Sequence, residues 1–381
     1  MIRVGFLLIN VGWMGGVNYY KNLFFALAKY QSENIQVIVL VGHSTKEKEI
    51  YEKYAEVIKE SFFDFNSLKN IYGRICNRLF RDKDWYLRKI IKKHRINVLS
   101  HSPFAEMKGV KTIPWIADFQ HIHLPEFFTE EELKSRNDSF MSYAQRSNGL
   151  ILSSCDALND LKKFLNGMKS VPAFVLNFVS QPDERYFELT EKDKNKLQEK
   201  YHLPDTFFYL PNQLWAHKNH ITVFKAIKTL KDNGIYVCVV CTGDMKDYRN
   251  DKHIQSILDF ISENNLEENV KLLGLIDYAD VYALIKFSKA VINPSLFEGW
   301  SSTVEECKSV GKPMILSNLA VHKEQYPNAV FFERENSADL AEKLEKYDEY
   351  AKNSAPVFDV RLATMEFAKT YEKIILDVMK I

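Results

Sequence analysis

The sequence Asn293-Pro-Ser-Leu-Phe-Glu-Gly-Trp-Ser-Ser-Thr-Val-Glu-Glu306 joins the end of an apolar run to the start of a helix. The run 290–293 predicts a buried strand, and residues 294–300 predict a loop. The stretch 302–305 has the spacing of a capping box and predicts a helix that continues to about Val310. A strand, a loop and a helix in this order form the repeating unit of a parallel α/β sheet.

Two carboxylates lie at this junction, Glu298 in the predicted loop and Glu306 in the predicted first helical turn. The free N–H groups of a helix start suit a diphosphate, and a carboxylate accepts hydrogen bonds from sugar hydroxyls. The junction therefore predicts a nucleotide-sugar site, with the amides from Gly299 through Trp300 and Ser301 to Ser302 facing the phosphates. For Glu305 we expect only a favourable dipole interaction on a solvated face.

Strands and helices alternate along the whole chain, as in a doubly wound fold. The first half predicts strands at 2–10, 35–41, 96–100, 112–117 and 149–153, with helices at 17–31 and 83–94 among others. The second half predicts strands at 207–211, 235–242, 269–273, 289–293, 313–316 and 329–332, with helices at 218–232, 250–264, 278–287, 302–310 and 337–349. We therefore expect an α/β protein with two Rossmann-like domains.

The domain boundary is expected in the polar stretch from about 180 to 204. This places an N-terminal domain at 1–180 and a C-terminal domain at 204–358. The run 359–381 has the apolar spacing of an amphipathic helix.

Length and composition are those of a globular enzyme, with 381 residues, 46% hydrophobic residues, 27% charged residues and a net charge of +1. No run of apolar residues is long enough for a membrane span, and we expect no signal peptide. The five cysteines lack a framework spacing, which favours a reducing, cytoplasmic location. Cys238 and Cys241 lie three apart in a predicted strand, where they point to opposite faces and pack in the core.

Three segments in order resemble the family 4 glycosyltransferases, which are retaining enzymes of the GT-B fold, and the polysaccharide and O-antigen branch in particular. Glu298 and Glu306 form the Glu-x7-Glu pattern of that family. The strand 2–10 followed by Gly15 and Gly16 is similar to its glycine-rich donor-side loop. The segment 207–220 is similar to the strand, basic pair and helix that hold the donor diphosphate.

The resemblance implies two domains facing a central cleft, with the C-terminal helix crossing back to the first domain. It also implies that Glu306 holds the nucleotide ribose and that Glu298 holds hydroxyls of the transferred sugar. Lys218 would stabilise the departing nucleoside diphosphate. The turn with Leu275 and Ile276 would frame the base. Gly15, Gly16 and Gln213 complete the expected donor site.

Gln213 stands five residues before Lys218, where the family commonly has an arginine. An amide donates hydrogen bonds but carries no charge, so either the clamp is weaker or another cation compensates, with His217 and Lys312 as candidates. No Asp-x-Asp motif stands at a strand end, and Asp277 and Asp280 have the wrong spacing. We therefore expect no metal and no cofactor besides the nucleotide-sugar co-substrate.

In the first domain, Ala117 precedes Asp118 where many relatives have a histidine. His121 is a candidate replacement as a neutral donor near the transferred sugar, and Asp118 joins it in the expected catalytic set. A structural histidine beside an aromatic cluster is an equally good interpretation of His121. His123 and His101 are weaker candidates.

The stretch 69–95 holds ten Lys and Arg against two Asp, a net charge of +8, interleaved with apolar residues. This pattern suits anionic lipid headgroups, and a helix packed on its sheet with a solvated basic back is the alternative. Nucleic acid is disfavoured because no recognised binding motif accompanies the patch.

The sequence thus predicts a cytoplasmic, retaining, metal-independent glycosyltransferase that moves a sugar from a nucleotide sugar to a saccharide or lipid-linked saccharide. The resemblance places it in surface polysaccharide or lipopolysaccharide synthesis, with the inner face of the cytoplasmic membrane as a second location favoured by the basic stretch. The rival interpretations are a GT-B sugar-nucleotide epimerase, a phosphorylase, and a non-catalytic sugar-nucleotide-binding partner subunit. No lysine context typical of a pyridoxal-dependent phosphorylase is present.

Overall fold

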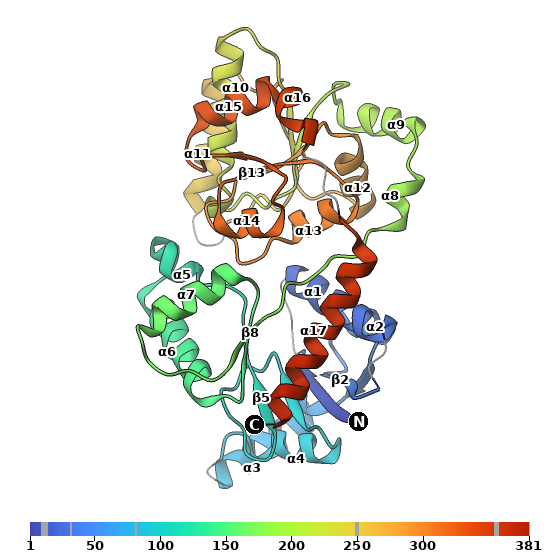
Figure 1. The fold of residues 1–381 in the computed structure, drawn as a ribbon, viewed down its shortest axis with the longest axis vertical. Coiled ribbons are helices and arrows are strands. Elements are labelled where there is room, and N and C mark those ends of the chain that lie inside the picture. The colour runs from blue at the N-terminus through green and yellow to red at the C-terminus, as the bar shows by residue number, and fades with distance from the viewer. Residues whose placement is uncertain (9–13, 31–32, 81, 248–250, 354–357, 381) are drawn as a thin grey trace. The chain divides into compact units, whose positions relative to one another are not determined.

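The structure is a computed structural model that describes residues 1–8, 14–30, 33–80, 82–247, 251–353 and 358–380. The chain divides into two compact units, each built on parallel strands with helices around them (Figure 1). The first unit contains Met1–Phe119, Thr129–Val179 and the residues from Arg361 on, and the second contains Gln120–Phe128 and Ser180–Val360. The expected α/β class with two Rossmann-like domains is confirmed.

The first unit contains a five-stranded parallel sheet in the order β3-β2-β1-β4-β5 and a three-stranded parallel sheet in the order β6-β7-β8. Pro114 separates β5 from β6, and its carbonyl accepts a hydrogen bond from the Ile151 N–H at 2.9 Å. A proline has no N–H for a sheet ladder, which explains the break. The strands are β1 (Ile2–Leu7), β2 (Ile35–Val41), β3 (Glu56–Lys59), β4 (Val98–Ser100), β5 (Lys111–Ile113), β6 (Trp115–Ile116), β7 (Leu150–Leu152) and β8 (Ala173–Val175).

Seven helices of at least four residues are described in the first unit. They are α1 (Met14–Lys29), α2 (Lys48–Tyr51), α3 (Leu68–Leu79), α4 (Trp85–Lys93), α6 (Glu130–Arg146), α7 (Cys155–Leu165) and α17 (Val360–Lys380). Helix α1 begins at Met14, so Gly15 and Gly16 lie in its first turn and not in a loop before it. Residues 9–13, which include the end of the predicted first strand, lie outside the described residues.

The long helix α17 packs in the first unit, where Figure 1 shows it in red. The Tyr30 hydroxyl donates to the Arg361 carbonyl at 3.0 Å, and the Asn34 amide donates to the Glu372 carboxylate at 2.6 Å. The ring of Tyr371 stacks 6.2 Å from that of Phe6 on β1. The last helix is therefore an integral part of the first unit although it is most distant in sequence.

The second unit contains one six-stranded parallel sheet in the order β11-β10-β9-β12-β13-β14. This is the order of the Rossmann fold, in which the chain reverses its direction of travel between the first and fourth strands, here β9 and β12. The strands are β9 (Phe208–Leu210), β10 (Val239–Cys241), β11 (Val270–Leu272), β12 (Val291–Asn293), β13 (Met314–Ser317) and β14 (Val330–Phe332).

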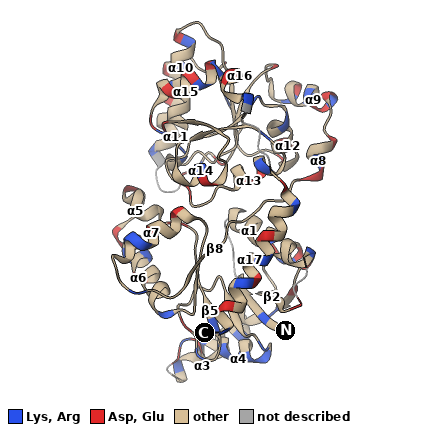
Figure 2. Cartoon of the chain, in the orientation of Figure 1, with Lys and Arg blue, Asp and Glu red and all other residues tan. Residues whose placement is uncertain are grey.

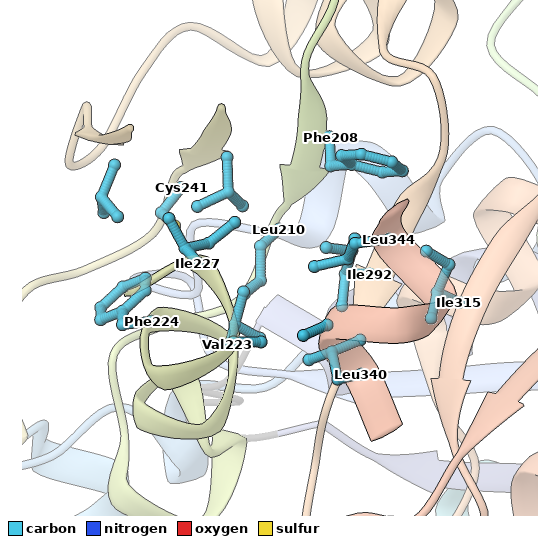
Figure 3. Packing of buried hydrophobic residues seen from close by; sticks show 14 of the residues in the cluster. Phe208, Leu210, Val223, Phe224, Ile227, Cys241, Ile292, Ile315, Leu340 and Leu344 are labelled. Atoms are coloured by element: carbon cyan, nitrogen blue, oxygen red, sulfur yellow. The ribbon is translucent and has the colours of Figure 1, made fainter. Parts of the chain in front are cut away.

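Helices cover both faces of this sheet, which is why its central strands are apolar without alternation. On one face α10, α11 and α15 pack on Leu210, Ile292 and Ile315, as Figure 3 shows for α10 and α15. On the other face α9, α12 and α13 pack on the opposite side chains of the same strands. The helices are α8 (Glu184–Glu188), α9 (Glu191–Tyr201), α10 (His220–Asp232), α11 (Asp251–Glu263), α12 (Tyr278–Phe287), α13 (Ser302–Ser309), α14 (Ala320–Gln325), α15 (Ser337–Glu345) and α16 (Tyr347–Tyr350).

The prediction for the cysteine pair is confirmed, because Cys238 lies in the core under α12 and Cys241 in the core under α10. The polar stretch 180–204 is not an open linker, since it forms α8 and α9. Helix α9 is bound to α12 through Asp280, which accepts hydrogen bonds from Lys200 and Tyr201 at 2.6 Å each. The second unit therefore begins near Ser180.

Across the described ranges, we find no helix that combines the length and the apolarity required to cross a bilayer.

Candidate functional site

Two loops of the second unit meet at the point where the strand order reverses. The first loop, 211–219, follows β9, and the second, 294–301, follows β12. They are joined directly, because the Leu296 N–H donates to the His217 carbonyl at 2.8 Å. In open α/β sheets, ligands bind beyond the carboxyl ends of the strands at such a reversal.

Each loop contributes one charge, and the two charges form an ion pair. Lys218 ends the short 3₁₀ helix Ala216–Lys218, and its Nζ lies 2.7 Å from Oε1 of Glu298. The two side chains are only 17% and 10% exposed, so the pair is largely removed from solvent. The site therefore presents a cation that is held in place and a carboxylate that is held in its ionised form.

The electrostatics of Glu298 follow from this arrangement. Burial by itself raises the pKa of the carboxyl, but the charge and hydrogen bond of Lys218, the nearby His322 and the Ser295 hydroxyl outweigh it and lower the pKa to about 2. Glu298 is thus a stable carboxylate that accepts hydrogen bonds and does not donate a proton at neutral pH.

Neighbours within the same loop orient Glu298. Its Oε1 accepts from the Ser295 hydroxyl at 2.7 Å and from the Asn293 amide at 3.5 Å. Asn293 ends β12 and is fully buried, and its amide also donates to the Ser301 hydroxyl at 3.0 Å. Asn293 therefore links the end of the strand to the start of α13 and sets the path of the loop between them.

The loop after β9 is supported from the neighbouring strand ends. Asp247 accepts from the Ala216 N–H at 3.0 Å and so stabilises the 3₁₀ helix that carries Lys218. Gly243, at φ +136, lies against the loop so closely that a Cβ atom would sit 2.6 Å from the Asn212 carbonyl oxygen. Asn219 adopts a left-handed conformation, and its amide donates to the carbonyls of Pro294 and Arg334 at 3.0 and 2.7 Å.

The start of α13 differs from the predicted capping box. The N-cap is Ser301, whose side chain caps no N–H, and its backbone is bound by Gln325 of α14 instead. The Gln325 amide accepts from the Ser301 N–H at 3.1 Å and donates to the Ser301 carbonyl at 2.8 Å. Ser301 N–H is therefore occupied, and this amide is not available to a phosphate in the conformation described.

Glu305 is fully buried, so the expectation of a solvated face is wrong. Its carboxylate accepts from Lys308 at 2.8 Å and from Gln325 at 3.0 Å, and burial raises its pKa. The local sequence around Glu305 did not reveal that α14 supplies a glutamine over this helix. Glu305 therefore joins α13 to α14 and lies away from the donor chemistry predicted for its neighbour.

Glu306 lies in the second helical turn, about 100° around α13 from Glu305. It is half-buried, and its charge raises the pKa values of Tyr278 and Tyr282 on α12, in addition to the larger effect of burial. Tyr278 is 50% exposed and its hydroxyl lies 3.3 Å from that of Tyr282. Glu306 thus faces a partly open tyrosine pair, separately from the Lys218 and Glu298 pair.

The other predicted donor residues of the second unit lie after the carboxyl ends of β9, β11 and β12. Gln213 is exposed in the loop after β9. Leu275 is 77% exposed after β11, whereas Ile276 packs against the core under α12. Gly299, Trp300 and Ser302 are half-buried around the start of α13.

Only one of the two candidates for the cation that Gln213 does not provide, His217 and Lys312, lies near the ion pair. Lys312 lies before the amino end of β13, opposite to the carboxyl ends that carry the site, and its Nζ donates to the carbonyls of Lys286 and Ser288, so that suggestion is wrong. His217 is buried next to Lys218 in the loop. Arg334, which the sequence did not single out, reaches the Glu298 loop, and its guanidinium donates to the Leu296 carbonyl at 3.1 Å.

The two catalytic candidates predicted for the first domain, Asp118 and His121, lie in different units. Asp118 follows β6 in the first unit, half-buried and 3.8 Å from the Arg136 guanidinium. His121 lies in the short helix α5 (Gln120–His123), is 2% exposed, and has its ring 6.4 Å from that of Phe128. The segment Gln120–Phe128 groups with the second unit, where the His123 ring lies 5.0 Å from that of Phe297.

His322 of α14 is a site neighbour that the sequence did not indicate. It is fully buried, its Nδ1 lies 2.9 Å from the Ser317 carbonyl, and it interacts electrostatically with Glu298 and Lys218. Burial lowers its pKa, and the nearby Glu298 carboxylate acts in the opposite direction. Asn293 and Ser295 could have been suspected from the quoted stretch, but His322 and Gln325 are near it only in space.

Among the residues that the structure describes, no three His, Cys, Asp or Glu side chains converge as a metal site would require.

Solved structures with the same fold cover almost the entire chain. A glycosyltransferase from Rickettsia africae ESF-5 has 15% identity and a TM-score of 0.66, over 100% of this chain and 99% of that chain. Anabaena HepE in complex with UDP-glucose has 16% identity and a TM-score of 0.71, over 98% and 100%. Sucrose-phosphate synthase from Thermosynechococcus elongatus has 11% identity and a TM-score of 0.69, over 99% and 100%.

No curated protein sequence matches the chain. Residues 191–353, which contain Lys218, Glu298 and Glu306, match a family model. The chain has the GT-B fold of two Rossmann-like domains, and residues 191–353 match the family model described as glycosyl transferases group 1.

Proposed function

We propose that the protein is a retaining glycosyltransferase whose second unit binds a nucleotide-sugar donor beyond the carboxyl ends of β9 and β12. The observation that carries this proposal is the Lys218 and Glu298 ion pair at the strand reversal. The match of residues 191–353 to glycosyl transferases group 1 supports it, as do the similar structures of HepE in complex with UDP and with UDP-glucose.

In this proposal the donor replaces contacts that the two charges now make with each other. The diphosphate binds the ammonium group of Lys218, and the sugar hydroxyls donate to Glu298. Both groups are already positioned, so little reorganisation is needed when charge develops on the leaving diphosphate. Glu306 accepts from the ribose hydroxyls beside Tyr278, and Leu275 and Ile276 frame the base.

Arg334 supplies the second cation that Gln213 does not provide. Its guanidinium is directed at the carbonyl of the Glu298 loop, 3.1 Å from Leu296 O. A planar guanidinium can engage a phosphate through two hydrogen bonds. Gln213 itself contributes a neutral hydrogen bond at the exposed side of the loop, and the helix start with Gly15 and Gly16 contributes from the first unit.

On the acceptor side we propose that Asp118 and His121 lie near the reacting sugar, with His121 as a neutral donor. The acceptor is a saccharide or a lipid-linked saccharide, in family 4 surface polysaccharide or lipopolysaccharide synthesis of the O-antigen type. The reaction needs no metal, and the enzyme is cytoplasmic and peripheral to the inner face of the membrane. The proposed acceptor, pathway, metal independence and location rest on the resemblance of the sequence to the family 4 glycosyltransferases.

Product analysis with a panel of nucleotide sugars tests the proposal. Nuclear magnetic resonance of the products with saccharide, lipid-linked and sugar-phosphate acceptors should show a new glycosidic bond with the donor's anomeric configuration. Glu298→Ala should abolish most of this transfer, and Glu306→Gln should weaken donor binding by about 1.5–3 kcal/mol. Formation of an epimerised donor, or of a sugar phosphate from inorganic phosphate, would replace the proposal with an epimerase or a phosphorylase. Donor binding without turnover would indicate a non-catalytic subunit.

A further inference from the structure

Helix α3 (Leu68–Leu79) exposes an apolar face that the protein itself does not cover. Its members lie at intervals of three and four residues, within about 100° of arc around the helix. They are Leu68 (87% exposed), Ile71 (41%), Tyr72 (55%), Ile75 (53%) and Leu79 (73%). Phe65 before the helix is 81% exposed, and Phe80 after it is 57% exposed with its ring stacked on Trp85 of α4.

The opposite side of α3 explains why this face points outward. The helix is attached through two small residues, Gly73 and Cys76, which are its only fully buried positions. A Cβ atom at Gly73 would lie 2.6 Å from the Phe62 ring and 3.1 Å from the Tyr86 ring, so the helix lies close against α4 and the segment before it. Because the buried side of α3 contains its smallest residues, its largest apolar side chains lie in solvent.

Cations flank the apolar face. Lys69, Arg74 and Arg78 are exposed on α3, which contains no acidic residue. The described part of the helix thus has a net charge of +3 beside five large apolar side chains. Figure 2 shows basic positions along both α3 and α4.

The basic stretch 69–95 therefore separates into two helices with different roles. Helix α4 fits the packed alternative, because Leu87, Ile90 and Ile91 are buried in the first-unit core. Two of its cations are already paired, Arg88 with Asp82 and Lys93 with Glu60. Helix α3 instead has its apolar side in solvent, and within the described part of the chain Lys69, Arg74 and Arg78 form no ion pair.

We propose that α3 is an interfacial helix that binds an anionic bilayer, with its apolar face among the acyl chains and Lys69, Arg74 and Arg78 at the headgroup phosphates. The combination of an apolar stripe with flanking cations and no acid fits this partner. A nucleic acid would not use the apolar face, and a protein partner would not require cations on both of its sides. The proposal does not depend on the donor site.

Vesicle co-sedimentation of the full chain tests the proposal. Wild type should bind vesicles of phosphatidylglycerol and phosphatidylethanolamine at low salt, and bind neutral phosphatidylcholine vesicles far more weakly. Lys69→Gln with Arg74→Gln and Arg78→Gln should lower the partition coefficient on the order of 100-fold. Leu68→Gln with Leu79→Gln should lower it at least about tenfold, because two side chains no longer enter the acyl region.

Matched controls separate this effect from misfolding and from general surface chemistry. Phe187→Gln removes a side chain that is 61% exposed in the second unit and should leave binding unchanged. Leu68 and Leu79 make few packing contacts at their exposure, so their variants should retain the wild-type melting temperature. Nucleoside diphosphate affinity should also be retained in every α3 variant.

Three results would overturn the proposal. The first is a wild type that does not bind anionic vesicles, and the second is an α3 leucine variant that binds them as wild type does. The third is a concentration-dependent dimer in light scattering that the leucine variant abolishes, which would assign the face to a second copy of the chain.

Discussion

At the scale of single residues, the account depends on the pair formed by Lys218 and Glu298. Each side chain is the principal partner of the other charge, at 2.7 Å and largely out of solvent. Removing one member of a buried pair leaves an uncompensated charge, and this costs more than removing both. The pair therefore has a structural role without ligand and a catalytic role with it, and the two roles can be measured separately.

The structural role predicts strong coupling between the two positions. Lys218→Met and Glu298→Gln should each destabilise the protein, and the double variant should be less destabilised than the sum. The coupling in unfolding free energy should be about 1–3 kcal/mol by denaturant titration. Additive effects within about 0.3 kcal/mol would mean that the two charges do not interact in solution.

The pH dependence of stability follows from the lowered pKa of Glu298. A carboxyl whose pKa is about 2 in the folded chain and 4.5 in its reference state stabilises the fold above the unfolded pKa. This contribution is lost as the pH falls through the folded value. The stability difference between wild type and Glu298→Gln should be constant above about pH 5 and shrink toward about pH 2. A difference that does not change over that range would show that the carboxyl has an ordinary pKa.

At the scale of elements, the site is a set of strand-end loops bound to each other. The loop after β10 supports the loop after β9, and the Gly243 N–H donates to the Gly274 carbonyl at 2.9 Å in the loop after β11. Gly243 has both a left-handed φ and a close approach to Asn212, so it constrains the path that leads to Lys218.

Gly243→Ala should therefore destabilise the protein by about 2 kcal/mol or more and also weaken donor binding, because the Asn212 carbonyl must move. Gly234→Ala is the matched control, since Gly234 has φ +74 but no atom within 4 Å of a Cβ position. The control carries only the cost of backbone strain, about 1 kcal/mol. Thermal melting and diphosphate titration of both variants check this. Equal effects of the two substitutions would show that the close approach of Gly243 to Asn212 adds nothing to stability or donor binding.

The elements themselves could be predicted well where a parallel sheet demands buried apolar strands. All six strands of the second unit lie within or beside their predicted ranges, since each is a short apolar run between polar segments. In the first unit β3 and β8 were not predicted. Glu56–Lys59 has charged ends, and the side chains of Ala173–Val175 are only half-buried, so neither run stands out as an apolar strand.

The site was predictable only where its parts are close in sequence. The stretch 293–306 indicated Glu298, but the buried His322 near it and the Gln325 that binds Ser301 come from α14, about twenty residues later. The interpretation of Glu305 was wrong because Gln325 of α14 binds its carboxylate, together with Lys308 three residues further along α13. Long-range polar partners leave no periodic signal in a single sequence.

At the scale of the whole molecule, the two units differ in how much evidence there is that each contributes to a donor site. The second unit contains the matched range 191–353 and the charged pair at its strand reversal. In the first unit, the corresponding loop after β1 falls in residues 9–13, outside the described ranges. The proposed chemistry is accordingly concentrated in the second unit, and tests of the intact enzyme address what both units do together.

Metal independence is an expectation for the intact enzyme. If Lys218 and Arg334 stabilise the leaving diphosphate, then excess chelator should leave the rate of transfer nearly unchanged. Initial rates with chelator, with magnesium and with manganese provide the measurement. Loss of transfer in chelator and its recovery with either ion would show that a divalent cation performs this stabilisation.

Titration calorimetry with nucleoside diphosphates tests whether the loops after β9 and β12 bind the donor. Wild type should bind one of UDP, GDP or ADP, and Lys218→Ala should weaken this binding while lowering the chemical step about 10²–10³-fold. Gln213→Arg should tighten it, because a guanidinium engages phosphate through two hydrogen bonds. Lys192→Ala, on the exposed side of α9, is the matched control and should change nothing. Equal affinity for every diphosphate in wild type, Lys218→Ala and Gln213→Arg would contradict the claim that these strand-end loops bind the donor.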